Sequence, residues 1–350
     1  MSFAELWSGL EPLGRDPGTT GYRRYSWTPA DAECRAWFTR QADRLGLTLE
    51  QDRNGNLWAW WDSRDETRQD AVVTGSHLDS VPDGGGYDGA LGVASALAAV
   101  AELKAKNFNP ERAVAIAVFT EEEGARFRVA CLGSRLITGV IDPASARGLS
   151  DDDGITLAAA MTAAGADPSL LGPDDDLLAR LGAFVELHVE QGRALAPMDA
   201  AIGVAESIWP HGRWRLDFTG RADHAGTARL ADRNDPMLPY ASTVLAARQA
   251  AAEHGVTFAT AQESYTPLVR FDENLRDRIS GVLARAGITA PVLPTAAGHD
   301  AGFLAARIPT AMLFVRNPAG VSHSPAEHAE AADCEAGVHA LALVLEDLAG

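Results

Sequence analysis

Short apolar runs bounded by polar clusters recur along the chain and predict buried β-strands. Residues 71–74, 113–119 and 310–315 are continuous apolar runs, and 183–192 begins as one and ends in polar residues. Continuous rather than alternating apolar strands are typical of a parallel sheet that is covered on both faces. Ala- and Leu-rich stretches with helix signals lie between them: 29–45, 90–104, 273–286 and 333–348. This alternation predicts an α/β fold, with a mostly parallel twisted sheet and flanking helices.

The pattern changes character in one internal segment. Residues 214–220 alternate apolar and polar positions, which is typical of an antiparallel strand with one exposed face. A long Ala-rich helical pattern follows at 236–254. We therefore predict a discontinuous main domain, residues 1–206 and 266–350, interrupted by a small α+β module at 207–265 that is shorter than a typical independent domain.

Composition and charge narrow the possible partners and the compartment. The chain has 350 residues, 46% of them hydrophobic, and a formal net charge of -18. Such an acidic balance disfavours nucleic acid and anionic membranes as partners, because both attract clustered Lys and Arg. The three cysteines form no CxxC pair, and neither a signal peptide nor a membrane-spanning run is evident. We expect a cytoplasmic protein.

Polar residues with metal-binding chemistry follow the predicted strands. His77, Asp79 and Asp88 come after the run at 71–74, and Glu122 and Glu123 come after the run at 113–119. The carboxyl ends of parallel strands meet at one edge of a sheet, where open α/β folds bind ligands. Imidazole and carboxylate groups gathered at that edge are the ligands of Zn²⁺, Mn²⁺ or Co²⁺.

Two more histidines extend this set. His188 lies near the end of the predicted strand at 183–192, on the same face as Glu186 and Glu190, and His323 follows the strand at 310–315. A glutamate run is often a solvated helix face, and a single strand histidine is usually a packing residue. Here, however, the histidines and carboxylates follow several separate strands, where structural residues would be apolar. The set therefore predicts a metal site.

The motifs that carry these residues resemble a known family. In chain order they are GSHLDSVPDGGGYDG, TEEEGARF, ELHVEQG, GRADHAGT, AGHDA and GVSHSPAEH. They are similar to those of the dinuclear-metal amidohydrolases that include N-carbamoyl-L-amino-acid hydrolases, β-ureidopropionases and allantoate amidohydrolases. These enzymes are relatives of the co-catalytic metallo-aminoacylases and carboxypeptidases. The resemblance implies a zinc-exopeptidase-like catalytic domain and a lid module that mediates dimerisation.

The resemblance also implies roles for individual residues. Two divalent ions per subunit would be held by five ligands: Asp88 as the bridge, His77 and His188 on one ion, and Glu123 and His323 on the other. Glu122 would be the general base. The carboxylate of Asp79 would accept the second N–H of the His77 imidazole and fix its tautomer.

Substrate contacts follow by the same resemblance. His224 would reach into the active site of the partner subunit of a homodimer and stabilise the developing oxyanion. Gln191 and the loop at Gly298 and His299 would contact a small ureido substrate. The expected products are ammonia and CO₂ from an N-carbamoyl-L-amino acid or from allantoate.

The lid module departs from the family pattern. The family holds the substrate carboxylate with an Asn and an Arg from further lid strands, but no Asn lies between Asn234 and Asn274 here. Arg248 and Arg270 are the only arginines of that interval, and neither lies in a matching motif. The lid is therefore expected to be truncated. Two alternative hypotheses follow: a peptidase or acylase with the same metal core, and a non-catalytic homologue.

Overall fold

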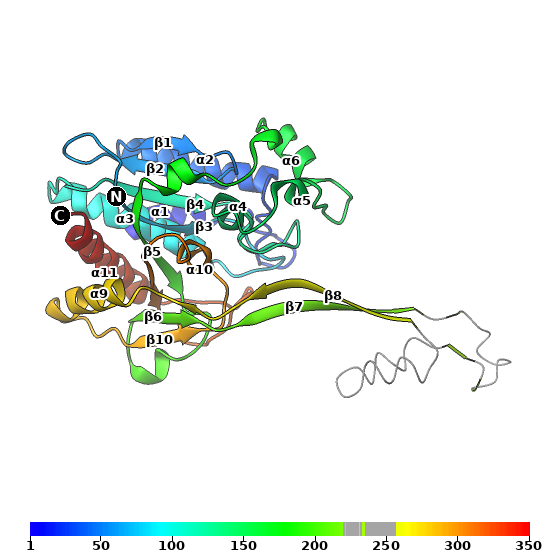
Figure 1. The fold of residues 1–350 in the computed structure, drawn as a ribbon. Helices are drawn as coiled ribbons and strands as arrows, with labels where there is room; N and C mark the ends of the chain where they lie inside the picture. The colour runs from blue at the N-terminus through cyan, green and yellow to red at the C-terminus, as the bar shows by residue number, and fades with distance from the viewer. Residues whose placement is uncertain (220, 222–230, 232, 235–256) are drawn as a thin grey trace. The chain divides into compact units, whose positions relative to one another are not determined.

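The computed structural model describes the chain except for residues 220, 222–230, 232 and 235–256 (Figure 1). The chain divides into two compact units, Met1–Trp209 with Leu268–Gly350, and Pro210–Pro267. In the second unit, β7 (His211–Thr219) pairs with β8 (Thr257–Thr266) in antiparallel register. The helix predicted at 236–254 and the predicted site residue His224 lie outside the described residues.

The first unit is built on one sheet of nine strands among the residues that the structure describes. At its centre, β3 (Ala71–His77) lies between β4 (Val114–Phe119) and β5 (Leu181–Val189), and β11 (Thr310–Val315) pairs with the far edge of β5. These pairings are all parallel. The remaining strands are β1 (Thr48–Gln51), β2 (Leu57–Trp61), β6 (Ile202–Ile208), β9 (Val269–Arg270) and β10 (Val292–Thr295). They add both parallel and antiparallel pairs, so the sheet is parallel at its centre and mixed at its edges.

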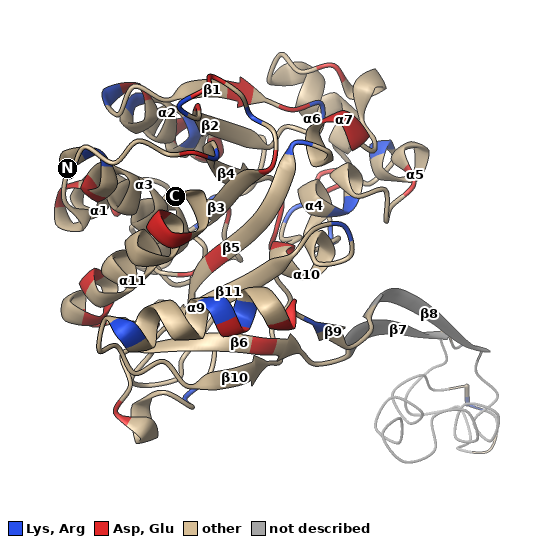
Figure 2. Ribbon diagram, turned by 60° about the vertical axis from the view of Figure 1, so that its left-hand side comes forward, with Lys and Arg blue, Asp and Glu red and all other residues tan. Residues whose placement is uncertain are grey.

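Helices cover both faces of this sheet (Figures 1 and 2). One face packs against α1 (Phe3–Leu10), α2 (Pro29–Arg44), α3 (Ala90–Ala105), α9 (Glu273–Arg285) and α11 (Ala331–Ala349). The other face packs against α4 (Leu132–Ile137), α7 (Asp175–Leu178) and α10 (Asp300–Leu304). The shorter elements are α5 (Pro143–Arg147), α6 (Leu157–Ala163), η1 (Pro168–Leu170) and η2 (Ala196–Met198). The predicted α/β class with flanking helices is confirmed.

Alternate residues of the central strands enter opposite cores, which explains their continuous apolar sequence. In β3, Val72 belongs to the core under α3 and α11, and Val73 belongs to the core on the other face. Among the described helices, none combines the length and apolar character needed to cross a membrane.

The start of α3 fixes the end of β3. The sequence predicted a strand that ended at Thr74, but β3 continues to His77, which is its last residue. Gly89, at the N-cap of α3, has a φ of 63°, and a Cβ there would lie 2.4 Å from the His77 ring. Only glycine satisfies both the left-handed backbone and this close approach. The helix therefore begins directly against the imidazole.

The surroundings of two helical glycines predict that substitution by alanine has opposite effects on stability at the two positions. A Cβ at Gly92 of α3 would lie 2.2 Å from the Leu187 carbonyl oxygen, whereas a Cβ at Gly281 of α9 meets nothing closer than the end of Arg285 at 3.5 Å. Gly92→Ala should lower the free energy of unfolding by about 1–3 kcal/mol through overpacking. Gly281→Ala should raise it by about 0.5–1 kcal/mol through helix propensity. Urea denaturation of the two variants measures both, and equal midpoints would contradict the packing described for α3.

Candidate metal centre

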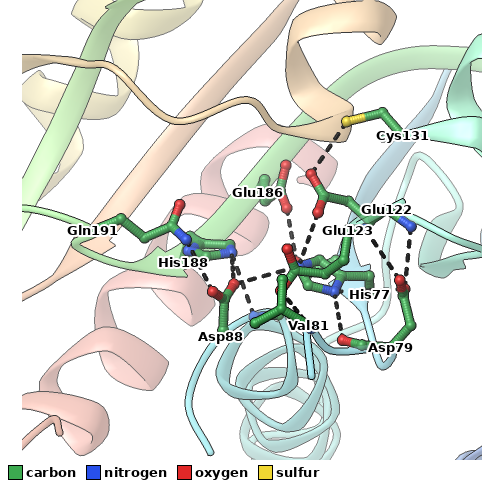
Figure 3. Close-up of polar contacts among 12 residues, drawn as sticks. His77, Asp79, Val81, Asp88, Glu122, Glu123, Cys131, Glu186, His188 and Gln191 are labelled. Carbon is green, nitrogen blue, oxygen red and sulfur yellow. Dashed lines mark hydrogen bonds and ion pairs between the residues drawn. The ribbon is translucent and has the colours of Figure 1, made fainter. Parts of the chain in front are cut away.

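The candidate site lies beyond the carboxyl ends of the central strands (Figure 3). His77 is the last residue of β3 and lies beside Phe119, the last residue of β4. His188 lies beside Phe314 in the pairing of β5 with β11. The parallel register therefore brings residues that are far apart in sequence to one edge of the sheet, as the sequence pattern predicted.

Asp88 lies at the centre of the site. Its Oδ1 is 3.2 Å from His188 Nε2 and 3.6 Å from His77 Nε2, and its Oδ2 is 3.3 Å from His323 Nε2. The same nitrogen of His323 is 3.5 Å from Glu123 Oε2. The five predicted ligands thus form two groups, and Asp88 belongs to both. Within each group the ligand atoms lie within 4.8 Å of one another, which is the arrangement that two ions with a shared carboxylate require.

In each of the two buried histidines, His77 and His188, a contact of Nδ1 with a backbone carbonyl fixes the orientation of the ring. His77 Nδ1 is 3.1 Å from the carbonyl oxygen of Asp79, and His188 Nδ1 is 2.9 Å from the carbonyl oxygen of Val189. A proton on each Nδ1 satisfies these carbonyls and leaves a lone pair on each Nε2. His188 Nε2 accepts the Gly89 N–H at 3.3 Å. His77 Nε2 is buried and has no hydrogen-bond partner among the described residues, so these donors fit a metal ion.

The carboxylate of Asp79 has a different role from the one predicted. The carbonyl oxygen of Asp79, rather than its carboxylate, lies within hydrogen-bond distance of His77 Nδ1, and the carboxylate is 3.6 Å away. The carboxylate instead accepts the backbone N–H groups of Glu122 at 3.2 Å and Glu123 at 3.1 Å. Asp79 therefore holds the loop that carries both glutamates.

The adjacent glutamates direct their carboxylates to different partners (Figure 3). Glu122 accepts a hydrogen bond from the Cys131 thiol at 3.2 Å, and its Oε2 is 3.6 Å from His77 Nε2. Glu123 accepts the Val81 N–H at 3.3 Å with one oxygen and faces His323 with the other. Burial raises the pKa of Glu122 to about 7.

Several further buried acids lie around this centre. Sequence reasoning assigned a role to one of them, Asp300, which directly follows Gly298 and His299 in the loop expected to contact the substrate. Glu121, Glu186, Asp300 and Glu327 are all buried, and burial raises the pKa of each carboxyl group. The first two lie in TEEEGARF and ELHVEQG, and the others lie in AGHDA and GVSHSPAEH. Their position within these motifs was therefore the available sequence signal, but a motif does not show which residues its members contact.

The buried acids make the charge of the centre strongly unbalanced. Among the described residues, the one Arg or Lys that is buried is Arg24. Isolated buried carboxylates are expensive unless they are paired, hydrogen-bonded or bound to metals. Two divalent cations would supply the missing positive charge, so the electrostatics as well as the donor set fit them.

The predicted substrate contacts fall in different places. Gln191 Nε2 lies 2.9 Å from Asp88 Oδ2 and 3.1 Å from Ser322 Oγ, so its side chain lies against the centre. The His299 ring is buried, with its centroid 4.5 Å from that of His188, and Gly298 precedes it as a half-buried residue. His224 is outside the described residues.

Comparisons with known proteins agree with this geometry. Residues 73–347 match Peptidase family M20/M25/M40, and the chain belongs to that family; it is a hydrolase. It is 31% identical to the N-carbamoyl-L-amino acid amidohydrolase of Geobacillus stearothermophilus, over 96% of each chain. It is 29% identical to the allantoate amidohydrolase of Escherichia coli, over 97% of this chain and 96% of the relative. An amidase of the hydantoinase/carbamoylase family from Burkholderia vietnamiensis has a similar structure, with a TM-score of 0.90, 27% identity and coverage of 99% and 97%.

The shared position of Asp88 predicts how metal content responds to substitution. Asp88→Asn should weaken the binding of both ions, and His323→Asn should weaken one. Loss of a direct ligand should lower the metal affinity by at least about 10–100-fold, which is the effect of removing a residue that only hydrogen-bonds to a ligand. Metal analysis after dialysis and calorimetric titration with Zn²⁺ measure this, with the exposed His339→Asn as control. Two tightly bound ions in Asp88→Asn would show that this carboxylate does not bridge.

Proposed function

We propose that this protein hydrolyses a linear C–N bond of a ureido or carbamoyl group, in an N-carbamoyl-L-amino acid or in allantoate, and releases ammonia and CO₂. The observation that carries the proposal is the pair of ligand groups that share Asp88, with the Glu122 carboxylate 3.6 Å from one of the ligating imidazoles. The names of the similar amidohydrolases support the choice of a ureido substrate.

Different residues of the chain would bind the metal ions and transfer the proton. Two divalent ions, Zn²⁺, Mn²⁺ or Co²⁺, would lower the pKa of water and polarise the ureido carbonyl when bound. His77, His188, Glu123 and His323 would hold them with Asp88. Glu122 would accept a proton from the attacking water and pass it to the leaving nitrogen. The carbamate formed in this step would then break down spontaneously to CO₂ and ammonia.

Substrate recognition would come from both units of the chain. Gln191 and the loop at Gly298 and His299 would contact the substrate beside the metals, because Gln191 and His299 lie against Asp88 and His188. His224 would act across the interface of a homodimer formed through the second unit. The three buried and unpaired cysteines are consistent with a reducing cytoplasm as the compartment.

Release of ammonia tests the proposed reaction. The metal-loaded chain should produce ammonia from N-carbamoyl-L-amino acids or from allantoate, and it should be slower on dipeptides and N-acyl amino acids. The reverse preference would favour the peptidase or acylase alternative. Two bound metals with no turnover of any of these substrates would favour a non-catalytic homologue.

Glu122 and Glu123 should separate chemistry from metal binding. Glu122→Gln should lower kcat by about 10²–10⁴-fold, the usual contribution of a positioned general base, and keep both ions. Glu123→Gln should lose an ion. Parallel assays of ammonia release and metal content measure both effects. If Glu122→Gln keeps the kcat of the wild type, Glu122 is not the general base.

Cys131 should support the base through its thiol. Burial raises the pKa of this thiol well above its usual value, so the sulfur stays protonated and donates to Glu122. Cys131→Ser keeps a donor, but Cys131→Ala removes it, which should lower kcat by about tenfold, as expected for a hydrogen bond to a charged group. Steady-state kinetics of both variants, with the buried Cys334→Ala as control, check this. Equal kcat values for the Ser and Ala variants would show that the hydrogen bond is unimportant.

A further inference from the structure

Glu327 connects two loops that approach the metal centre from distant parts of the sequence. It lies in the loop after β11, four residues beyond His323, and its side chain is buried. Its Oε1 accepts the backbone N–H of Tyr87 at 3.1 Å and that of Asp88 at 2.9 Å. These two amides immediately precede Gly89, the N-cap of α3, which has no side chain to cap the helix. A carboxylate from a distant loop therefore satisfies two backbone amides directly before the helix.

The loop segment that carries His323 and Glu327 contacts both the carboxylate and the backbone amide of Asp88. His323 faces the Asp88 carboxylate, with Nε2 3.3 Å from Oδ2, and Glu327 accepts the Asp88 amide. His323 has a φ of 54°, an unfavourable backbone for a residue with a Cβ, which persists only where the surroundings hold it. The turn is closed by the Glu327 N–H donating to the Ser324 carbonyl oxygen at 2.9 Å.

We propose that Glu327 is a positioning residue that holds the backbone of Asp88, and thereby sets the carboxylate shared by the two ligand groups. Glu327 belongs to neither of the two ligand groups that share Asp88. Its carboxylate fixes where the Asp88 side chain starts, and the segment that carries it also presents His323. The inference rests on the proposed function, because that function takes Asp88 as the bridging ligand.

Gly85 provides the space that Glu327 needs. A Cβ at this glycine would lie 2.3 Å from Glu327 Oε1 and 2.4 Å from Glu327 Cβ, so any larger residue would displace the carboxylate from the two amides. Gly85→Ala therefore disturbs the same contact from the opposite loop while it leaves Glu327 in the sequence.

Metal affinity of the full-length chain tests the role. Glu327→Ala and Gly85→Ala should each weaken the binding of both ions by about 10–100-fold, the range known for outer partners of metal ligands. Glu327→Gln keeps an oxygen that accepts the two amides, so its loss should be smaller. Calorimetric titration of the metal-free proteins with Zn²⁺ measures the affinities, and thermal unfolding of the same samples measures stability. Glu330→Gln, an exposed residue three positions later that pairs with His328, is the matched control.

The outcomes separate positioning from a purely structural role. Unchanged affinity for both ions in Glu327→Ala and Gly85→Ala, with or without a lower unfolding temperature, would overturn the inference. If Glu327→Ala does not fold, Gly85→Ala decides by the same measurement. A wild-type chain that binds two ions but releases no ammonia would reject the proposed function and leave this comparison of affinities valid.

Discussion

The structure of the centre depends on keeping many carboxylates in a buried space. Buried acids must be hydrogen-bonded, paired or bound to cations, and the loops that carry them must also satisfy their own amides. One solution meets both needs: a carboxylate that accepts two consecutive backbone N–H groups. It occurs at Asp79, Glu121, Glu190 and Glu327, whose donors are 122–123, 126–127, 194–195 and 87–88. These acids stabilise the loops, whereas Asp88, Glu122 and Glu123 face the imidazoles.

This division explains why neighbouring residues of similar chemistry have different roles. Glu121 binds the amides of its own loop, Glu122 faces His77 and the Cys131 thiol, and Glu123 faces His323. The φ of 56° at Glu121 shows that the backbone turns sharply here. Three consecutive acids in an extended strand would alternate between two faces. At this turn the three carboxylates point to different partners: Glu121 to backbone amides, Glu122 to His77 and Cys131, and Glu123 to His323.

Much of the fold, and the gathering of candidate ligands at one edge of the sheet, could be predicted from periodicity, whereas the role of each ligand came from the resemblance of the motifs to a known family. Continuous apolar strands indicated a sheet covered on both faces, and parallel pairing then brought their ends together, which placed His77, Glu123 and His188. The role of Asp79 could not be predicted, because spacing does not show whether a carbonyl or a carboxylate of the same residue accepts the imidazole N–H. Glu327 was missed for another reason: its partner amides are 239 and 240 residues away, and no local pattern reports such a contact.

Every residue proposed to bind metal or to act as base belongs to the first unit of the chain, Met1–Trp209 with Leu268–Gly350. Gln191, Gly298 and His299 belong to it as well, whereas His224 belongs to the segment Pro210–Pro267. The contacts that hold Asp88 are made within the first unit, through Gln191, His188, His323 and Glu327. The geometry of the candidate ligands therefore rests on contacts within the first unit.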